Sequence, residues 1–255
     1  MADPVIPDTS DWPLLGIAER NTYRVSDGLI DMRRPVRQHR SARLTALPQD
    51  VLLDLEKTAL IVIDMQNDFC DANGAGAKYG ADVSTIQDMI PRMQSFFDGA
   101  RTLGAQLIFV QCIHEPSTDS DTWLFRHGGV PRPHCRKGTW GADFCGVAPQ
   151  GTEPIVIKHR YSAFIGTRFE SVLKTLGIRT LIMTGVGTNV CVESTARDGF
   201  MLDYNIVFLS DCTATASPGA HEATLQNIGS FFGTVVTSDE VLAVWRSKAP
   251  ARAVA

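Results

Sequence analysis

From residue 58 onward, short runs of mostly apolar residues alternate with longer segments of helical periodicity. Strands that are apolar throughout are typical of a sheet buried on both faces, and parallel strands need crossover connections, usually helices. With right-handed crossovers, the alternation predicts an α/β fold: a doubly wound, mostly parallel six-stranded sheet with helices on both faces. The expected strands are residues 58–63, 106–111, 154–157, 180–184, 205–209 and 233–236. The expected helices are residues 83–103, 168–176, 190–203, 218–228 and 238–247.

Two segments depart from this pattern. Residues 1–50 contain five prolines, and a cluster of five arginines between residues 33 and 43, with no regular period. We expect them to form an arm ahead of a single domain over residues 51–255, either packed on that domain or on a neighbouring subunit, or solvated as a tail. Residues 115–151 are rich in Gly, Pro, His and Trp, and a loop of this length is usually functional or disordered.

The composition argues against several classes of function. The net charge is −4, and seven acidic residues within the first fifty offset the arginines there, so no nucleic-acid partner is expected. No apolar stretch reaches the length of a membrane span, so no membrane partner is expected either. The six cysteines form no C-x-x-C pair, which argues against a zinc ribbon or a thioredoxin-type site. We therefore expect reduced thiols and a cytoplasmic location.

Three chemically active side chains lie at the ends of expected strands. Asp64 follows the first strand, Lys158 follows the third, and Cys191 lies in the turn after the fourth. Ligands of such sheets bind beyond the carboxyl ends of the strands, so these side chains are expected to converge. Each also has an ordinary interpretation, as a turn former, a surface charge and a small buried side chain. Together they suit nucleophilic catalysis, because a cation lowers the pKa of a thiol and a carboxylate can take its proton.

The turn that carries Cys191 allows two interpretations. Cys191 lies between a glycine-bearing turn and an expected helix, where backbone N–H groups and the helix dipole favour a thiolate. Gly185 and Gly187 after a strand could alternatively belong to a nucleotide-binding module. The third glycine of that fingerprint would fall at Val190, so the nucleotide motif fails on its own pattern.

Three motifs occur in the order of a known family. They are DMQNDF at residues 64–69, KHRYSAF at 158–164 and GVGTNVCV at 185–192. Together they resemble the isochorismatase-like cysteine hydrolase superfamily, over residues 55–245. The resemblance implies a parallel-sheet fold, an Asp64–Lys158–Cys191 triad and amide hydrolysis. It also implies a cis peptide bond between Val186 and Gly187, and an oxyanion hole formed by the backbone N–H groups of Gly187 and Cys191.

Within the superfamily, the chain is most similar to the ureidoacrylate and biuret amidohydrolase branch. This implies a small ureido or carbamoyl substrate, cleaved at a C–N bond through a covalent cysteine intermediate. Which compound it is, among biuret, triuret, ureidoacrylate and N-carbamoyl amino acids, stays open. The candidate substrate-binding residues are Gln66, Asn67, Phe69, Tyr161, Phe164 and Asn227. Alternative roles are a helix cap for Asn67, a packed aromatic for Tyr161 and a solvated helix face for Asn227.

Other members of this superfamily define the alternatives. Nicotinamidase-like relatives bind a metal through an Asp-x-His arrangement, but here the aspartate position is Cys112. His114, His127 and His134 are the remaining candidate ligands, and we expect no metal and no cofactor. An N-carbamoylsarcosine-type or nicotinamidase-type amidase stays possible. A true isochorismatase lacks the nucleophilic cysteine, and a catalytically silent scaffold has no use for an intact triad. The resemblance also implies a homo-oligomer, a dimer or a tetramer.

Overall fold

The computed structural model describes residues 6–15, 23–26, 28–33, 40–126, 128–129, 131 and 133–248. At its centre lies a parallel six-stranded sheet in the order β11–β10–β9–β6–β7–β8. The strands are β6 (Thr58–Ile63), β7 (Gln106–Cys112), β8 (Ile155–Lys158), β9 (Thr180–Val186), β10 (Asn205–Ala214) and β11 (Thr234–Val236). Each begins within one residue of its expected start, which confirms the doubly wound α/β fold.

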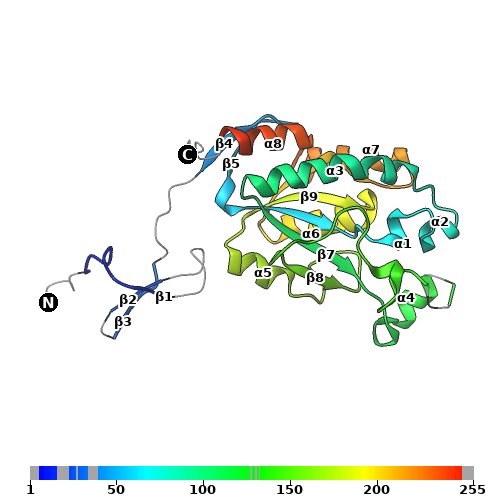
Figure 1. Ribbon diagram of the computed structural model, residues 1–255, viewed down its shortest axis with the longest axis horizontal. Coiled ribbons are helices and arrows are strands. Elements are labelled where there is room, and N and C mark those ends of the chain that lie inside the picture. Colours follow the sequence, from blue (N-terminus) through cyan, green and yellow to red (C-terminus); the bar gives the residue numbers. More distant parts are fainter. Residues whose placement is uncertain are drawn as a thin grey trace.

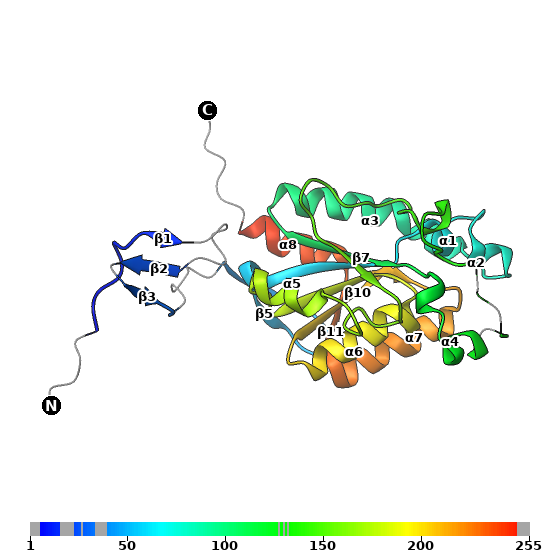
Figure 2. The same cartoon turned by 90° about the horizontal axis from the view of Figure 1, so that it is seen from below.

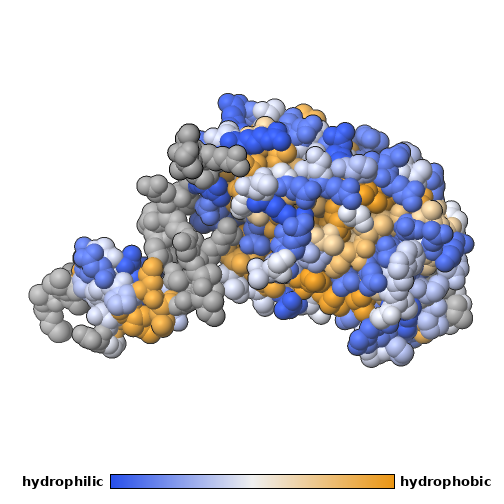
Figure 3. Space-filling view, viewed as in Figure 1, coloured by the Kyte–Doolittle hydropathy of each residue, from blue (hydrophilic) through white to orange (hydrophobic). Residues whose placement is uncertain are grey.

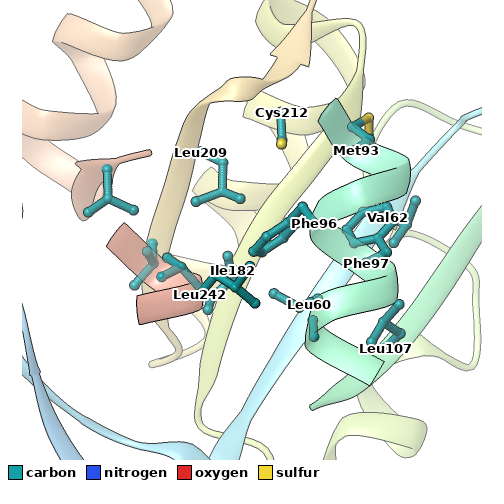
Figure 4. Packing of buried hydrophobic residues seen from close by; sticks show 14 of the residues in the cluster. Leu60, Val62, Met93, Phe96, Phe97, Leu107, Ile182, Leu209, Cys212 and Leu242 are labelled. Carbon is teal, nitrogen blue, oxygen red and sulfur yellow. The ribbon is translucent and has the colours of Figure 1, made fainter. Parts of the chain in front are cut away.

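Helices cover both faces of this sheet (Figures 1 and 2). They are α3 (Ser84–Thr102) and α8 (Ser238–Ser247) on one face, and α5 (Phe169–Leu176), α6 (Glu193–Met201) and α7 (Pro218–Asn227) on the other. In β6, Leu60 and Val62 join the core under α3 and α8, whereas Ile61 joins the core under α5 and α6. Figure 4 shows Phe96 and Phe97 of α3 in the core under α3 and α8. Burying one such side chain stabilises the fold by about 1.5–3 kcal/mol.

A β-hairpin extends the domain on its amino-terminal side. It consists of β4 (Ser41–Leu44) and β5 (Val51–Asp54) and leads through the short helix η2 (Leu55–Lys57) into β6. Leu44 is fully buried in the core that α8 completes, and Leu47 exchanges backbone hydrogen bonds with Val235 of β11. The boundary expected at residue 50 therefore falls inside this hairpin. We propose that the domain begins near residue 40.

The arm contains a small sheet of its own, formed by β1 (Leu14–Leu15), β2 (Tyr23–Ser26) and β3 (Leu29–Asp31). This sheet lies beside the α/β body in both ribbon views (Figures 1 and 2). Its apolar side chains reach the surface, as the space-filling view shows (Figure 3); Leu14 and Ile30 are each more than half exposed. Arg33, Arg40 and Arg43 pair with nearby carboxylates, while positions 34 and 37 of the arginine cluster lie outside the described residues.

Short helices gather in the segments that follow the strands at their carboxyl ends. They are α1 (Asn67–Cys70), α2 (Ala75–Lys78), η3 (Pro116–Thr118), α4 (Asp121–Arg126), η4 (Trp140–Ala142) and the π-helical turn η5 (Thr188–Val192). A second π-helical turn, η6 (Ile228–Phe232), instead joins α7 to β11. The expected helix over residues 190–203 is thus divided, because η5 precedes α6. Among the helices that the structure describes, none has the length and apolar character needed to cross a membrane.

Candidate active site

The carboxyl ends of the strands bring Asp64, Lys158 and Cys191 together. Asp64 leaves β6 with a positive φ of 53°, and Lys158 is the last residue of β8. The Lys158 ammonium lies 2.8 Å from Asp64 Oδ2 and 3.4 Å from Cys191 Sγ, and it also donates to the carbonyl oxygen of Arg160 at 3.1 Å. Asp64 and Lys158 are fully buried, and Cys191 is 9% exposed. The convergence expected from the sequence is therefore present.

Burial and charge set the protonation of this group. Burial raises the pKa of Asp64, and the neighbouring Lys158 charge opposes that rise. Burial alone would lower the pKa of Lys158, but the charges of Asp64 and Cys191 raise it above its usual value. Burial raises the pKa of Cys191 well above that of an ordinary thiol, although Lys158 opposes this. Desolvation thus outweighs the cation and favours the thiol form of Cys191, whereas its place before a helix favours a thiolate.

The Asp64 carboxylate is in contact with both other members of the triad. It forms a close ion pair with Lys158, and the Cys191 thiol lies within hydrogen-bonding range of it. Burial raises the pKa of Asp64, which makes it a stronger base than an exposed carboxylate. It therefore lies ready to take the proton of the neighbouring thiol.

The turn between β9 and α6 depends on the glycines that precede Cys191. Gly185 has a φ of 109°, and a β-carbon there would lie 2.0 Å from the carbonyl oxygen of Ile63. Only glycine allows β9 to pass this close to β6. The peptide bond between Val186 and Gly187 is cis, as the resemblance implied. Gly187 and Cys191 then stand at the start of the η5 turn and within it.

Two of the candidate substrate-binding residues serve the structure around the site. The Gln66 amide donates to the carbonyl oxygens of Cys112 and Ala142 and accepts from the Cys112 N–H, at 2.7 to 2.8 Å. Its hydrogen-bonding groups are thus engaged by backbone, so Gln66 joins β7 to the following loop, which argues against the substrate contact expected of it. Asn67 is buried and donates to the Trp140 carbonyl oxygen at 2.8 Å, and the helix-cap alternative fails because Asn67 lies inside α1.

Three other candidates lie in different surroundings. Tyr161 is 40% exposed, and its ring lies tilted against the Trp123 ring with centroids 5.3 Å apart. Phe69 is half-buried and packs with the loop after β7. Phe164 instead packs with Phe169 and Tyr204 against the core under α5 and α6, which argues against the substrate contact expected of it.

Asn227 lies at the end of α7 that is farther from the triad. This helix begins four residues after β10 ends and returns along the sheet toward the start of β11. Asn227 is its last residue, so it stands near the amino ends of the strands. This place argues against the expected substrate contact, because ligands of this fold bind at the opposite edge of the sheet.

The loop after β7 adds residues that the sequence did not single out. Trp123 of α4 lies between the His114 and Tyr161 rings, with centroids 5.0 and 5.3 Å away, and the Arg160 guanidinium lies over it at 5.2 Å. Asp68 accepts backbone hydrogen bonds from Ala75 and Cys135 and so fixes two of the loops around the site. The motif at residues 64–69 contained Asp68, but Trp123 carried no signal beyond the unusual composition of its segment.

Of the histidines considered as metal ligands, the two that the structure describes contact different side chains. His114 Nε2 lies 3.2 Å from Cys112 Sγ, and burial lowers the pKa of His114 to about 4. His134 stacks against Tyr79, and His127 lies outside the described residues. Within the described part of the chain, no three His, Cys, Asp or Glu side chains are grouped in a way that could hold a metal ion.

Comparisons with known proteins agree with this geometry. The model of the isochorismatase domain matches residues 58–240. The chain is 37% identical to the ureidoacrylate amidohydrolase RutB of Stutzerimonas stutzeri over 77% of this chain and 86% of that protein. It is 34% identical to RutB of Methylorubrum extorquens over 82% and 91%. A cysteine hydrolase from Pseudomonas syringae pv. phaseolicola superposes with a TM-score of 0.70 at 27% identity, over 80% of this chain and 98% of that one. The chain therefore belongs to the isochorismatase family.

Proposed function

We propose that this protein is a cysteine-dependent amidohydrolase that cleaves a C–N bond of a small ureido or carbamoyl compound. Its family and the amidohydrolases and cysteine hydrolases among its relatives make it a hydrolase of amide C–N bonds. The observation that supports the cysteine mechanism is the position of Lys158, buried and in contact with both Asp64 and Cys191. A buried ammonium placed between a carboxylate and a thiol suits proton exchange between them.

The first step is attack by the thiol. Asp64 takes the Cys191 proton while Lys158 holds both negative charges in turn, so the proton moves without separating charge in the buried site. The thiolate adds to the substrate carbonyl carbon and forms a tetrahedral oxyanion. In this proposal the backbone N–H groups of Gly187 and Cys191 hold that oxyanion, and one such donor is worth about 2.7–4 kcal/mol in a transition state.

The second step releases nitrogen and regenerates the thiol. Asp64 gives the proton to the departing ammonia or amine, and the C–N bond breaks to leave a thiocarbamate on Cys191. Water, activated by Asp64, then adds to this intermediate, and the C–S bond breaks with the proton returning to sulfur. A carbamic acid released in this way decomposes to carbon dioxide and the remaining amine or ammonia.

The substrate class rests on the relatives and on the motif residues of this chain. Two relatives are named for ureidoacrylate, which supports a ureido group in the substrate. Cys112 at the position of a nicotinamidase metal-binding aspartate favours a ureido compound over nicotinamide, and its thiol contacts His114 instead. A homo-oligomer, dimer or tetramer, and a cytoplasmic location are part of the proposal; six free cysteines suit a reducing compartment.

Ammonia release tests the proposal directly. Purified protein is assayed with biuret, triuret, ureidoacrylate, N-carbamoylsarcosine and nicotinamide, beside Cys191→Ser and the control Cys145→Ser. We expect turnover of a ureido compound that Cys191→Ser abolishes and Cys145→Ser retains. Turnover of nicotinamide alone would show that the substrate is nicotinamide-like and that the proposed ureido class is wrong. Turnover by Cys191→Ser at the wild-type rate would refute the cysteine mechanism. Inactivity throughout, with Cys191 no more reactive than the other thiols, would favour a silent scaffold.

A further inference from the structure

Arg160 stands beside the proposed reaction centre without being part of the triad. It follows Lys158 by two residues in the loop after β8, and its carbonyl oxygen accepts a hydrogen bond from Lys158 Nζ at 3.1 Å. The Arg160 side chain is half-buried. The Arg160 charge reaches the Cys112 thiol, which the charges of Lys158 and Asp64 reach as well, so the guanidinium lies close to the triad.

The partners of the Arg160 guanidinium are all neutral. Nη1 donates to the carbonyl oxygens of Thr118 and His159 at 3.1 and 2.6 Å, and Nη2 donates to Ser120 Oγ at 3.3 Å. These bonds use three of the five N–H groups of a guanidinium. The Nε–H and one Nη2 N–H have no acceptor among the residues that the structure describes. Nε and Nη2 together form the edge of a guanidinium that can bind a carboxylate through two parallel hydrogen bonds.

The Arg160 charge also lacks an acidic partner in contact with it. Within the described ranges, no Asp or Glu oxygen lies in ion-pair distance of Arg160. Asp119 is close enough to feel its charge, but both Asp119 oxygens bond to Arg136 at 2.8 and 2.9 Å. The Lys158 charge is matched by Asp64. One positive charge beside the reaction centre is therefore left for an anion from outside the chain.

The aromatic rings around Arg160 give this charge a defined direction. Its guanidinium lies over the Trp123 ring at 5.2 Å, and the Tyr161 ring lies 5.3 Å from Trp123. Stacking on an aromatic face limits the rotation of the guanidinium plane and leaves its edge open. Such a wall suits a flat conjugated acid that lies along the rings with its carboxylate at Arg160.

We propose that Arg160 binds the carboxylate of the substrate, so that the enzyme selects ureido acids over neutral ureido compounds. The inference rests on the proposed function, because it places the substrate's other end at Lys158 and Cys191. Ureidoacrylate has both a ureido group and a carboxylate on a flat carbon chain, whereas biuret has no charge to offer this arginine. Arg160 is in this account a specificity-determining residue that takes no part in proton transfer.

The test compares ureidoacrylate with its neutral primary amide on variants of the full chain. Arg160→Met should lower kcat/KM for the acid by on the order of 10- to 150-fold, the range for losing a hydrogen bond to a charged group, and mainly through KM. The kcat/KM for the amide should change by less than about threefold, because the amide has no carboxylate to lose contact with Arg160. Arg160→Lys keeps the positive charge but loses the paired N–H donors of the guanidinium, so its kcat/KM for the acid should lie between those of wild type and Arg160→Met. The control is Arg168→Met, since Arg168 also bonds a backbone carbonyl, that of Ile155 at the start of β8.

Three results would overturn the inference. If the wild-type enzyme turned over the acid and the amide equally well, it would not recognise the substrate carboxylate. Equal losses for both compounds in Arg160→Met would assign Arg160 a structural role. In a Cys191→Ala background, which removes chemistry, unchanged calorimetric binding of ureidoacrylate after Arg160→Met would have the same meaning. Absence of turnover with every ureido compound would instead refute the proposed function, while this binding measurement still decides the role of Arg160.

Discussion

Lys158 shows how a single residue ties the stability of the fold to its chemistry. A fully buried ammonium is costly unless it is paired and hydrogen-bonded, and Asp64, Cys191 and the Arg160 carbonyl together occupy it. Removing it would leave the Asp64 carboxylate buried without its ion-pair partner. The residue thus stabilises the fold only together with the groups that it is proposed to serve.

Replacing Lys158 by methionine should therefore affect activity and stability together. We expect Lys158→Met to lower kcat by about 10²–10⁴-fold, the range for losing a positioned acid–base group. Unfolding should become easier by about 3–5 kcal/mol, because a buried charge loses its partner. Steady-state kinetics and urea denaturation measure the two effects. Lys174→Met, at an exposed lysine paired with Glu170, should leave both unchanged. A Lys158→Met enzyme with normal kcat would exclude Lys158 from the mechanism.

His114 makes a prediction about stability and pH. Burial lowers its pKa from 6.5 to about 4, so the folded protein binds its proton less readily than the unfolded chain. The stability that this residue contributes is present above pH 6.5 and declines as the pH falls from 6.5 toward 4. The free energy of unfolding of His114→Asn, compared with wild type from pH 4.5 to 8, should reveal this as a smaller dependence on pH. Parallel curves for the two proteins would show that His114 titrates normally.

At the scale of elements, the loops around the site depend on the close approach of Gly141 to Asp68. A β-carbon on Gly141 would lie 2.0 Å from Asp68 Oδ2, and the buried Asp68 carboxylate is held by the Ala75 N–H at Oδ1 and by the Cys135 N–H at Oδ2. Moving this side chain away from Gly141 would therefore strain or break these two hydrogen bonds. The contact therefore fixes η4 against α1 and sets the distance between two of the segments that surround the triad.

The substitution Gly141→Ala should disturb these segments. We expect a loss of about 1–3 kcal/mol in the free energy of unfolding, the usual cost of overpacking, together with lower activity. Gly219→Ala is a matched control, because a β-carbon at that position in α7 meets nothing within 4 Å and alanine favours helices. Urea denaturation of both variants measures the difference. If Gly141→Ala were as stable as Gly219→Ala, Asp68 would not be holding these loops.

The strands and long helices could be predicted because local pattern determines them. Apolar runs of four to six residues and helical periodicity placed β6 and α8 at their observed bounds. The convergence of Asp64, Lys158 and Cys191 could be predicted because the carboxyl ends of parallel strands meet at one edge of the sheet. The role of Gln66 could not be predicted in this way, since its amide bonds to the backbone of residues 46 and 76 positions away. The surroundings of Phe164 and Asn227 could not be predicted either, because they depend on how α5, α6 and α7 pack.

At the scale of the whole molecule, the arm carries apolar surface that its own small sheet cannot cover. Leu14, Leu15, Leu29 and Ile30 are each at least half exposed. Three strands of two to four residues are too short to bury a core of their own. Within the proposed homo-oligomer, we expect these side chains to pack against a neighbouring subunit. The hairpin β4–β5 belongs instead to the core of its own domain through Leu44.

Removing the arm should therefore change assembly and leave the domain folded. A chain that starts at residue 40 should lower the mass found by light scattering after size-exclusion chromatography. Its midpoint of thermal unfolding, measured at low protein concentration where dissociation contributes least, should stay close to that of the full chain. An unchanged mass would show that the arm takes no part in assembly. A domain that fails to fold would show that the arm packs on its own subunit.

The covalent intermediate is the most direct test of the account. Enzyme turning over a ureido substrate is quenched in acid, and the mass of the peptide that contains Cys191 is measured. We predict an increase equal to one carbamoyl or acyl group on Cys191, formed in wild type and absent in Asp64→Asn, where the base is lost. Full turnover without any modified Cys191, or a modification on another cysteine, would contradict the proposed mechanism.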